Sequence, residues 1–376
     1  MTTDRKNESL LAMAEALRVH KADIEAANEI DRNADLTPAK KERLRVDVES
    51  IAVSLEAIAA LPDPVGRIER REPQGAFELH RRRVPLGVIL MIFESRPNVT
   101  PEAGALCLKS GNAAILKGGS EARATNEAMM SAMQGAFPEG AIQLVSGGHE
   151  AIAELLQLEE LIDLVIPRGG EGLIRAVAEQ SRIPVLKHYR GNCHVYVDAD
   201  ADLEMAYRVL ENAKCQRAAT CNAAEKVLVH ADVASQFIPR LAELGVELRG
   251  DDASRQILAM KTATDDDWPE EYLDLVLGVK VVQSLDEAID HIERFGSHHT
   301  DAIISNDAGA AERFLDEVDS ATVLWNASTR LADGGVFGLG AEVGISTDKL
   351  HARGPMGLDE LTTYKWVVHG SGTLRQ

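Results

Sequence analysis

The sequence predicts an α/β protein with two domains, each built around a mostly parallel sheet. Its 376 residues, 45% of them hydrophobic, are enough for two or three domains with ordinary cores. Short apolar segments alternate with helical segments in two series, one before and one after residue 221. Strands connected by helices of about ten or more residues form parallel sheets, which bind ligands beyond the carboxyl ends of their strands.

The N-terminal part is predicted to be helical. Residues 7–60 have helical periodicity, with Thr37 as a cap and Pro38 at the first position of a helix, and LPDPVG at 61–66 ends this region. The strand-like segment ELHRRRVPLGVILMIFES follows at 78–95. A helix then begins near Pro101, with Thr100 as its N-cap.

The two alternating series follow in order. In the first, the predicted strands are AAILKG, AIQLVSGG, IDLVIPRGG, IPVLKHY and HVYVD, with helices between most of them. In the second, strands EKVLVH, VKVV, DAIIS and ATVLWNAS alternate with helices VASQFIPRLAEL, LDEAIDHIERF and AAERFLDEV. The glycine-rich tail from about residue 328 is predicted to be ordered loop with close backbone approaches.

Composition excludes several classes of function. The net charge of −20 argues against general binding to nucleic acid or to anionic membranes. The chain has no apolar run of about eighteen residues and no signal-peptide pattern at its charged N-terminus, so we expect a cytoplasmic protein without a membrane span. Four cysteines without a C-x-x-C pair indicate neither a disulfide framework nor a zinc knuckle, and no metal site is expected.

Two glycine-rich strand ends are candidate sites for anionic ligands. The usual dinucleotide and P-loop fingerprints are absent. Lys117, in AAILKGGS, suits a ribose hydroxyl or a phosphate beside a helix N-terminus, although a solvated turn lysine explains it equally well. Arg168 precedes Gly169 and Gly170 in IPRGG, which suits an anionic oxygen; pairing of Arg168 with Glu171 is the alternative. Polar side chains including Asn98 leave another strand end in FESRPNVTPEAG.

The cysteines differ in context. Cys107 lies on an apolar helix face and is expected to pack in the core, and Cys215 lies in a helix. Cys193 precedes His194, with His188 nearby, but no further ligand is suitably spaced for a metal. Cys221 lies in the polar segment QRAATCNAAE, where a thiolate is a nucleophile if its pKa is lowered and an inert thiol otherwise.

Taken together, these segments resemble the γ-glutamyl phosphate reductase (glutamate-5-semialdehyde dehydrogenase) family of the aldehyde dehydrogenase superfamily. The resemblance covers about residues 80–368, and it is carried by VPLGVILMIFESRPNVTPEAGALCLKSGNAAILKGGSEA, IPRGG, GNCHVYVD, NAKCQRAATCNAAE and NASTRLADGGVFGLGAEVGISTDKLHARGPMGLDELTTYKW. It implies an aldehyde dehydrogenase-like fold with a small oligomerisation flap. The implied parts are an NADP-binding domain with N-terminal helices (1–71 and 86–193), a catalytic domain (194–355), and a flap and tail (72–85 and 356–376).

The resemblance implies a reaction with Cys221 as the nucleophile, near the join of the two domains. The reaction is NADPH-dependent reduction of L-glutamate 5-phosphate to glutamate 5-semialdehyde through a thioester, the second step of proline synthesis from glutamate. Amides near the nucleophile, including that of Cys221, would stabilise the oxyanion, with Asn98 and Asn222 as alternatives for a further donor. Hydrolytic relatives carry a water-activating glutamate where this chain has Tyr189-Arg190-Gly191-Asn192, without a carboxylate.

The resemblance also assigns binding residues. Ser120 replaces a glutamate that NAD-preferring relatives place on the ribose 2′-hydroxyl, which with Lys117 favours NADP. Arg168, Gly169 and Gly170 fall in the cofactor region, and Glu271 matches the glutamate that holds the nicotinamide ribose, unless it is a solvated acid in an acidic loop. The candidate cations for the substrate's carboxylate or phosphate, unless they only pair loops, are Arg330, His351 and Arg353.

Three rival hypotheses remain at the level of the sequence. A hydrolytic aldehyde dehydrogenase acting on another small aldehyde would need a base that the 189–192 segment lacks. A non-catalytic scaffold would not need Cys221 or the tail motif. A metal-binding protein would use His188, Cys193 and His194. The expected partners are a small-molecule substrate and a second copy of the chain, and association with a glutamate 5-kinase stays open.

Overall fold

The protein divides into two compact units. The computed structural model describes residues 1–74 and 77–375. Unit 1 comprises Met1–Lys187, Gly338–Ile345 and Pro355–Gln376, and unit 2 comprises His188–Phe337 and Ser346–Gly354. The chain thus passes from the first unit to the second a few residues before the expected boundary at 193/194. The tail crosses between them within the short strands β14 (Gly344–Ser346) and β15 (Gly354–Met356).

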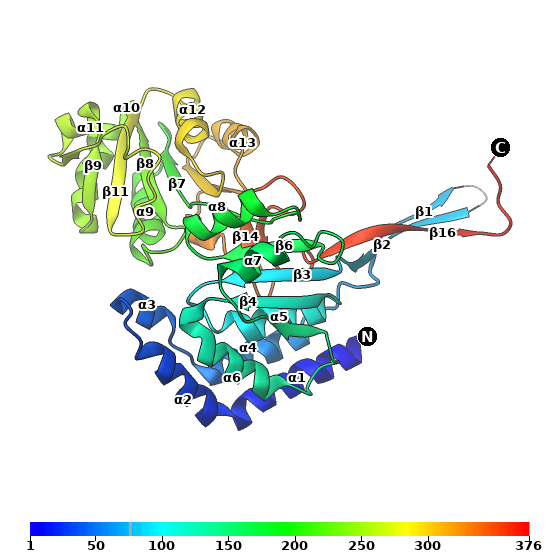
Figure 1. Cartoon of the computed structure of the whole chain (residues 1–376). Coiled ribbons are helices and arrows are strands. Elements are labelled where there is room, and N and C mark those ends of the chain that lie inside the picture. Colours follow the sequence, from blue (N-terminus) through cyan, green and yellow to red (C-terminus); the bar gives the residue numbers. More distant parts are fainter. Residues whose placement is uncertain (75–76, 376) are drawn as a thin grey trace. The chain divides into compact units, whose positions relative to one another are not determined.

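Unit 1 contains a parallel sheet of four strands in the order β5-β4-β3-β6. Its strands are β3 (Val88–Phe93), β4 (Ala113–Gly118), β5 (Ile142–Leu144) and β6 (Leu164–Arg168). Strand β3 is the apolar run VILMIF, which suits a central strand covered on both faces. Helices α7 and α8 pack on the face that presents Leu90 and Ile92, whereas α5 and α6 cover the other face (Figure 1).

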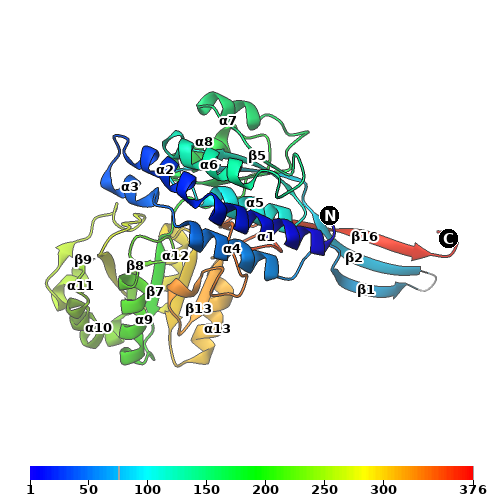
Figure 2. The same cartoon turned by 90° about the horizontal axis from the view of Figure 1, so that it is seen from below.

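The helices of unit 1 surround this sheet. They are α1 (Thr3–Val19), α2 (Lys21–Arg32), α3 (Pro38–Arg43), α4 (Val48–Ala60), α5 (Val99–Lys109), the 3-10 turn η1 (Ser120–Ala122), α6 (Arg123–Met133), α7 (His149–Leu155) and α8 (Glu171–Gln180). Helices α1 and α4 lie side by side (Figure 2). The predicted helical region is interrupted after α3, and α4 restarts at Asp47, whose side chain accepts a hydrogen bond from the Ser50 amide.

A separate antiparallel sheet in the order β1-β2-β16 extends away from the four-stranded sheet (Figure 1). It consists of β1 (Ile68–Gln74), β2 (Phe77–Pro85) and β16 (Thr362–Gly370). Residues 75 and 76 of the expected flap lie outside the described part of the chain. The segment predicted as one strand at 78–95 is therefore two strands in different sheets, separated at Gly87, whose φ of +136° few other residues adopt.

Unit 2 contains a parallel sheet of seven strands in the order β10-β9-β11-β8-β7-β12-β13. Its strands are β7 (Cys193–Val197), β8 (Ala224–His230), β9 (Glu247–Gly250), β10 (Lys261–Thr262), β11 (Val276–Val282), β12 (Thr300–Ile304) and β13 (Thr322–Trp325). Its helical segments are α9 (Leu203–Cys215), α10 (Ala231–Phe237), η2 (Ile238–Leu244), α11 (Asp252–Ile257), α12 (Leu285–Phe295), α13 (Ala308–Glu317) and η3 (Thr329–Leu331).

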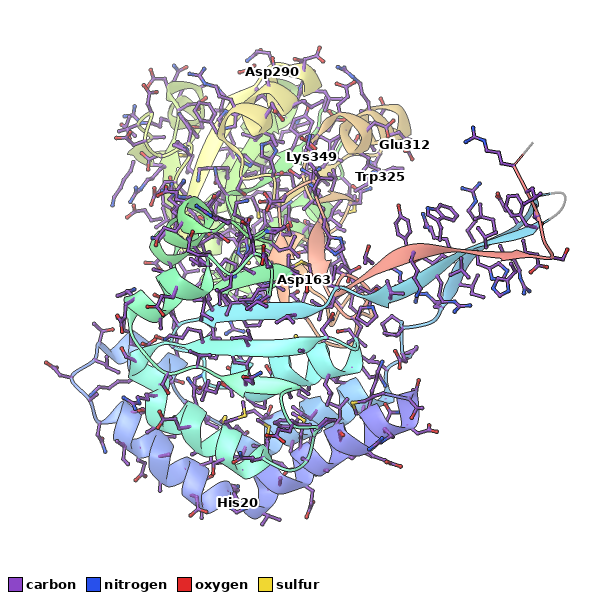
Figure 3. All side chains as sticks on the ribbon, turned by 45° about the vertical axis from the view of Figure 1, so that its right-hand side comes forward. His20, Asp163, Asp290, Glu312, Trp325 and Lys349 are labelled. Carbon is purple, nitrogen blue, oxygen red and sulfur yellow. The ribbon has the colours of Figure 1, made fainter. Side chains whose placement is uncertain are left out.

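Alternate residues of the unit 2 strands face opposite layers of helices. On β7, Val195 and Val197 pack with α9, α10 and η2, whereas Tyr196 packs with Phe314 of α13 and with α12. Figure 3 labels Asp290, Glu312 and Lys349, which are exposed residues of this unit. The alternating series of the sequence therefore predicts β7, β8, β11, β12 and β13 correctly, but it misses β9, α11 and β10.

Three further local predictions are wrong. The segment 183–189 is not a strand, and only an isolated bridge pairs Val185 with Val165. The helix expected from Pro101 begins at Val99, and the Thr100 hydroxyl donates to Asn126 instead of capping. The single helix expected at 233–244 changes to 3-10 geometry at Ile238, because Pro239 cannot continue the α-helical hydrogen bonds. No helix in the described residues combines the length and the apolar character of a membrane span.

Candidate functional site

Cys221 lies in unit 2 on the loop between α9 and β8, and its backbone is tightly packed. The loop leading into β7 passes so close that a Cβ on Gly191 would lie 1.7 Å from the Cys221 carbonyl oxygen. The Cys193 thiol donates to the same carbonyl at 3.2 Å. Cys221 is itself partly exposed, whereas Cys107 and Cys193 are buried. The fold therefore holds the Cys221 backbone in one place, while the residue as a whole stays partly exposed.

Glu271 is joined to the same loop. Its carboxylate Oε1 accepts a hydrogen bond of 2.9 Å from the Gly191 amide. Asn192 secures the neighbouring residues, because its Nδ2 donates to the carbonyl oxygens of Trp268 and Phe295 at 2.8 and 2.7 Å. The structure thus brings Glu271, which the sequence placed in an acidic loop, next to the Cys221 backbone through Gly191.

A buried cluster of charged side chains contacts the loop that carries Glu271. Lys226 donates to Asn192 Oδ1 at 3.0 Å and to the Glu270 carbonyl at 2.7 Å, and Lys214 pairs with Glu225 at 3.2 Å. All three charged side chains are fully buried. Burial raises the pKa of the Glu225 carboxyl and lowers the pKa of the Lys226 ammonium. Such groups persist in a core only when paired, which indicates that the loop's position is strongly determined.

Two histidines lie beside the Cys221 thiol. One ring nitrogen from each of His188 and His299 lies within 4.8 Å of the Cys221 sulfur and of the other ring nitrogen. His299 is 1% exposed, its Nδ1 lies 2.9 Å from the Thr300 hydroxyl, and its Nε2 has no hydrogen-bond partner among the described residues. Burial, and secondarily His188, lowers the pKa of His299 to about 3, so this imidazole is neutral at physiological pH.

The neutral buried state of His299 predicts loss of stability in acid. Its pKa is about 3 in the folded protein against 6.5 as the ordinary value, so below pH 6.5 only the unfolded chain takes up the proton. Unfolding becomes more favourable by about 1.4 kcal/mol per pH unit in this window, or about 2 kcal/mol at pH 5. The free energy of unfolding, measured with urea at pH 7 and at pH 5, should therefore differ by about 2 kcal/mol less in the variant His299→Gln than in the parent chain. An unchanged difference would contradict the assignment; His20→Gln, at an exposed position (Figure 3), is the control.

Asn222 and Arg330 are brought together next to Cys221. The Arg330 guanidinium donates to Asn222 Oδ1 and, at 2.9 Å, to Gln216 Oε1, while Asn222 Nδ2 donates to the Ala332 carbonyl at 3.0 Å. Asn222 is 3% exposed. One predicted substrate cation, Arg330, therefore lies in the immediate surroundings of the nucleophile.

The other two predicted substrate cations lie elsewhere in unit 2. Arg353 pairs with Asp319 at 2.7 Å and donates to the Asp319 carbonyl at 2.8 Å. Lys349 and Arg353 lower the pKa of Asp319 to about 2, Lys349 being the larger cause. His351 is exposed on the same segment. The structure therefore shows loop pairing for Arg353, which is the alternative that the sequence left open.

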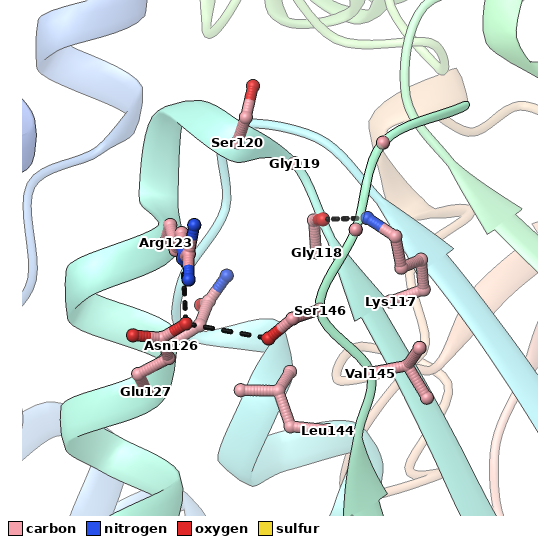
Figure 4. A pocket seen from close by; sticks show the side chains of 12 residues that line it. Lys117, Gly118, Gly119, Ser120, Arg123, Asn126, Glu127, Leu144, Val145 and Ser146 are labelled. Atoms are coloured by element: carbon pink, nitrogen blue, oxygen red, sulfur yellow. Dashed lines mark hydrogen bonds and ion pairs between the residues drawn. The ribbon is translucent and has the colours of Figure 1, made fainter. Parts of the chain in front are cut away.

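Unit 1 contains a pocket of about 320 Å³ at the carboxyl end of β4 (Figure 4). Lys117 and Ser120 line it, together with Gly118, Gly119 and the strand-end residues 144–148. Lys117 is 5% exposed, its ammonium donates to the Gly118 carbonyl at 2.9 Å, and burial lowers its pKa. Arg123 also lines the pocket and pairs with Glu127 at 2.8 Å. The pocket thus has a glycine-rich rim with two cations, Lys117 and Arg123, and one carboxylate, Glu127.

The other predicted residues of unit 1 are engaged within the unit. The Gly170 amide donates to the Glu94 carboxylate at 3.0 Å, and a Cβ on Gly169 would lie 2.5 Å from the same carboxylate. Arg168 lies 4.0 Å from Glu342, whereas Glu171 pairs with Arg175. The helix N-terminus that we expected to receive a ligand anion therefore already holds a carboxylate.

Asn98 begins α5 and donates through Nδ2 to Glu102 at 2.9 Å. Burial raises the pKa of this Glu102 carboxyl, and the Asn98 hydrogen bond opposes that effect. Asn98 belongs to unit 1 and the alternative oxyanion donor, Asn222, to unit 2.

Sequence reasoning missed several of these residues. His299, Arg123 and Lys226 are not in any recognised pattern, although the pair His298-His299 directly precedes a strand and Arg123 begins the helix after the Lys117 strand end. Their roles depend on contacts between distant segments, such as the 4.0 Å approach of Cys193 to His299. The spacing along the chain does not reveal such contacts.

Comparison with known proteins places this arrangement in a family. Residues 1–274 match the model of the aldehyde dehydrogenase family. The chain is 50% identical to a γ-glutamyl phosphate reductase of Geobacter metallireducens over 396 aligned positions, covering all of this chain and 94% of the relative. It is 51% identical to one from Xylella fastidiosa, again over its whole length and 93% of the relative.

Solved structures give the same result. A crystal structure of γ-glutamyl phosphate reductase from Thermotoga maritima is 43% identical and superposes with a TM-score of 0.98 over all of this chain and 95% of that chain. An acetylating aldehyde dehydrogenase from Geobacillus thermoglucosidasius is only 18% identical, with a TM-score of 0.71 over all of this chain and 94% of that chain. The latter likeness concerns the fold alone.

Proposed function

The chain belongs to the γ-glutamyl phosphate reductases of the aldehyde dehydrogenase family, and on this premise we propose that it reduces L-glutamate 5-phosphate to L-glutamate 5-semialdehyde with release of phosphate. NADPH is the proposed reductant, and the reaction is the second step of proline biosynthesis from glutamate. The observation that carries the proposal is the partly exposed Cys221, held by Gly191 and flanked by two histidines and Glu271.

The unit 1 pocket fits the adenosine part of a nicotinamide cofactor. The glycines at 118, 119, 147 and 148 allow close backbone approach, and Lys117 and Arg123 supply positive charge. Ser120 at the rim is small and neutral, which leaves room for a 2′-phosphate. In this proposal Arg168, Gly169 and Gly170 border the cofactor, and Glu271 holds the nicotinamide ribose. NADPH, when bound, supplies the hydride.

Cys221 carries the covalent chemistry in this proposal. Its thiol loses its proton to solvent, since His299 with a pKa of about 3 is too weak a base to hold it, and the thiolate attacks the acyl carbon. The carbon–oxygen bond to phosphate breaks, which leaves a thioester on the sulfur. After reduction the carbon–sulfur bond breaks, which releases the semialdehyde and restores the thiolate. The Cys221 amide and either Asn98 or Asn222 are the proposed oxyanion donors.

Arg330 is the leading proposed cation for the substrate's carboxylate or phosphate. It is joined to Asn222, the residue after the nucleophile. His351 and Arg353 stay as proposed contributors, although Arg353 is paired with Asp319.

The test runs the reaction backwards, because the acyl phosphate is labile. The purified chain is mixed with glutamate 5-semialdehyde, NADP and phosphate, and NADPH formation is followed. We expect NADPH formation that depends on phosphate, because only phosphate resolves the thioester. NADPH formation without phosphate would contradict the proposal and indicate the hydrolytic alternative, in which a carboxylate such as Glu271 activates water.

Ser120→Glu should exchange the cofactor preference. A carboxylate at the rim of the Lys117 pocket repels a 2′-phosphate and accepts hydrogen bonds from a ribose 2′-hydroxyl. We expect the KM for NADP to rise by about 10- to 100-fold, corresponding to about 1.4–2.8 kcal/mol, while the KM for NAD stays constant or falls. Steady-state kinetics with both cofactors measure this, and an equal rise for both would show that Ser120 does not read the 2′-position.

The antiparallel sheet is proposed as the homodimer flap. β16 is an edge strand of that sheet and exposes Tyr364, Trp366 and Val368 by 48, 48 and 59%. We expect a dimer mass in light scattering that Trp366→Lys reduces toward the monomer. A mass unaffected by this variant would place the dimer interface on another surface.

A further inference from the structure

Cys221 and the two histidines beside it also form the donor set of a metal centre. His188, Cys221 and His299 offer two imidazole nitrogens and one sulfur, all within 4.8 Å of one another. The three residues come from the loop before β7, the loop before β8 and the segment before β12. Parallel strands β8, β7 and β12 are neighbours in the sheet, so their preceding loops meet at one edge. This explains why the spacing along the chain predicted no metal site.

The dimensions suit a small ion. Bonds of about 2.0–2.3 Å from zinc to nitrogen and sulfur place the ligand atoms of a tetrahedral site roughly 3.5 Å apart. The three ligand atoms lie within 4.8 Å of one another, so the distances between them have to shorten by about 1 Å when the ion binds. Rotation of the partly exposed His188 and Cys221 side chains provides such movement, whereas His299 is fixed by burial.

The chemistry of the donors selects the class of ion. Imidazole and thiolate favour zinc and related thiophilic cations, whereas magnesium and calcium prefer oxygen ligands. His299 adds an independent reason, since its buried Nε2 has no hydrogen-bond partner among the described residues. A buried imidazole nitrogen without a hydrogen-bond partner costs free energy. When one nitrogen of the ring binds an ion, the other carries the proton and donates the hydrogen bond.

We propose that His188, Cys221 and His299 bind Zn²⁺ and that this binding reversibly switches the enzyme off. The sulfur bound to the ion is no longer available to attack an acyl carbon, so metal and substrate compete for Cys221. Binding follows from the donor geometry alone, whereas the inhibition rests on the proposed function of Cys221. Three protein ligands leave a fourth tetrahedral position for water or for an anion such as phosphate.

Direct binding of Co²⁺ tests the site without any assay of activity. The EDTA-treated full-length chain is titrated with Co²⁺, and we expect one equivalent to give thiolate-to-cobalt charge-transfer absorption with tetrahedral visible bands, both removed by Zn²⁺. Cys221→Ser should lose the charge-transfer band, and His188→Ala and His299→Ala should each weaken binding by more than about 100-fold. The exposed His20→Ala is the matched control and should bind as the parent chain does.

A second measurement uses only the parent chain, so it does not depend on variants that fold. Zn²⁺ should slow alkylation of Cys221 by iodoacetamide, located by peptide mass spectrometry, and should inhibit phosphate-dependent NADPH formation until EDTA is added. No charge-transfer band and no protection in an active enzyme would overturn the metal site and leave the proposed function intact. A metal-bound Cys221 in a chain without activity would overturn the proposed function and leave the site intact.

Discussion

Replacing Cys221 with alanine is expected to abolish phosphate-dependent NADPH formation, with a loss in kcat of at least about 10⁴-fold. The alanine removes the only atom that forms the thioester in the proposed reaction. It leaves the backbone contacts of the loop with Gly191 and Cys193, because these involve the Cys221 carbonyl. We therefore expect the free energy of unfolding and the affinity for NADPH, measured by fluorescence titration, to stay close to those of the parent chain.

Cys215→Ala is the control for this variant. Cys215, like Cys221, is a partly buried cysteine outside any disulfide, but it lies at the end of α9 and its sulfur contacts the Leu244 carbonyl at 3.8 Å. It should keep full activity. Substantial phosphate-dependent turnover in Cys221→Ala would show that another group carries the acyl intermediate, and that the mechanism proposed here is wrong.

The alternation of strands and helices predicts most of the fold, because the four-stranded and seven-stranded sheets are parallel and covered on both faces. Runs such as VILMIF in β3 have no solvated face, so their strand character is visible in composition alone. The failures occur where tertiary context decides. Residues 183–189 are apolar enough for a strand but pair only through Val185, and the run at 78–95 is cut at Gly87 into strands of two separate sheets.

The candidate site is predictable only in part, for a similar reason. Cys221 stands out in QRAATCNAAE, and Lys117 and Ser120 stand out in AAILKGGS; the structure places the last two residues in one pocket. The sequence did not indicate that Glu271 bonds to Gly191, or that Arg330 bonds to Asn222, because each contact joins segments far apart in the chain. Conversely, it suggested an anion site after Arg168, where Glu94 already accepts from Gly170.

Gly191 is the position where a single methyl group is expected to do the most damage without removing any reacting atom. A Cβ there would lie 1.7, 2.4 and 2.5 Å from the carbonyl oxygen, carbonyl carbon and Cα of Cys221. These are backbone atoms, so no side-chain rotation relieves the overlap, and the two loops have to separate. The Gly191 amide also donates to Glu271, so the same displacement moves the proposed ribose ligand.

We therefore expect Gly191→Ala to lower kcat by at least about 100-fold, because a shift of about 1 Å at a nucleophile has that effect. The KM for NADPH should rise as Glu271 moves, and the rate of iodoacetamide labelling of Cys221 should change, while the hydrophobic core of unit 2 keeps the sheet folded. Gly172→Ala is the matched control, since a Cβ at Gly172 meets no atom within 4 Å. A normal kcat in Gly191→Ala would show that the loop before β7 moves away without cost. The close packing of Gly191 against Cys221 would then not position the nucleophile.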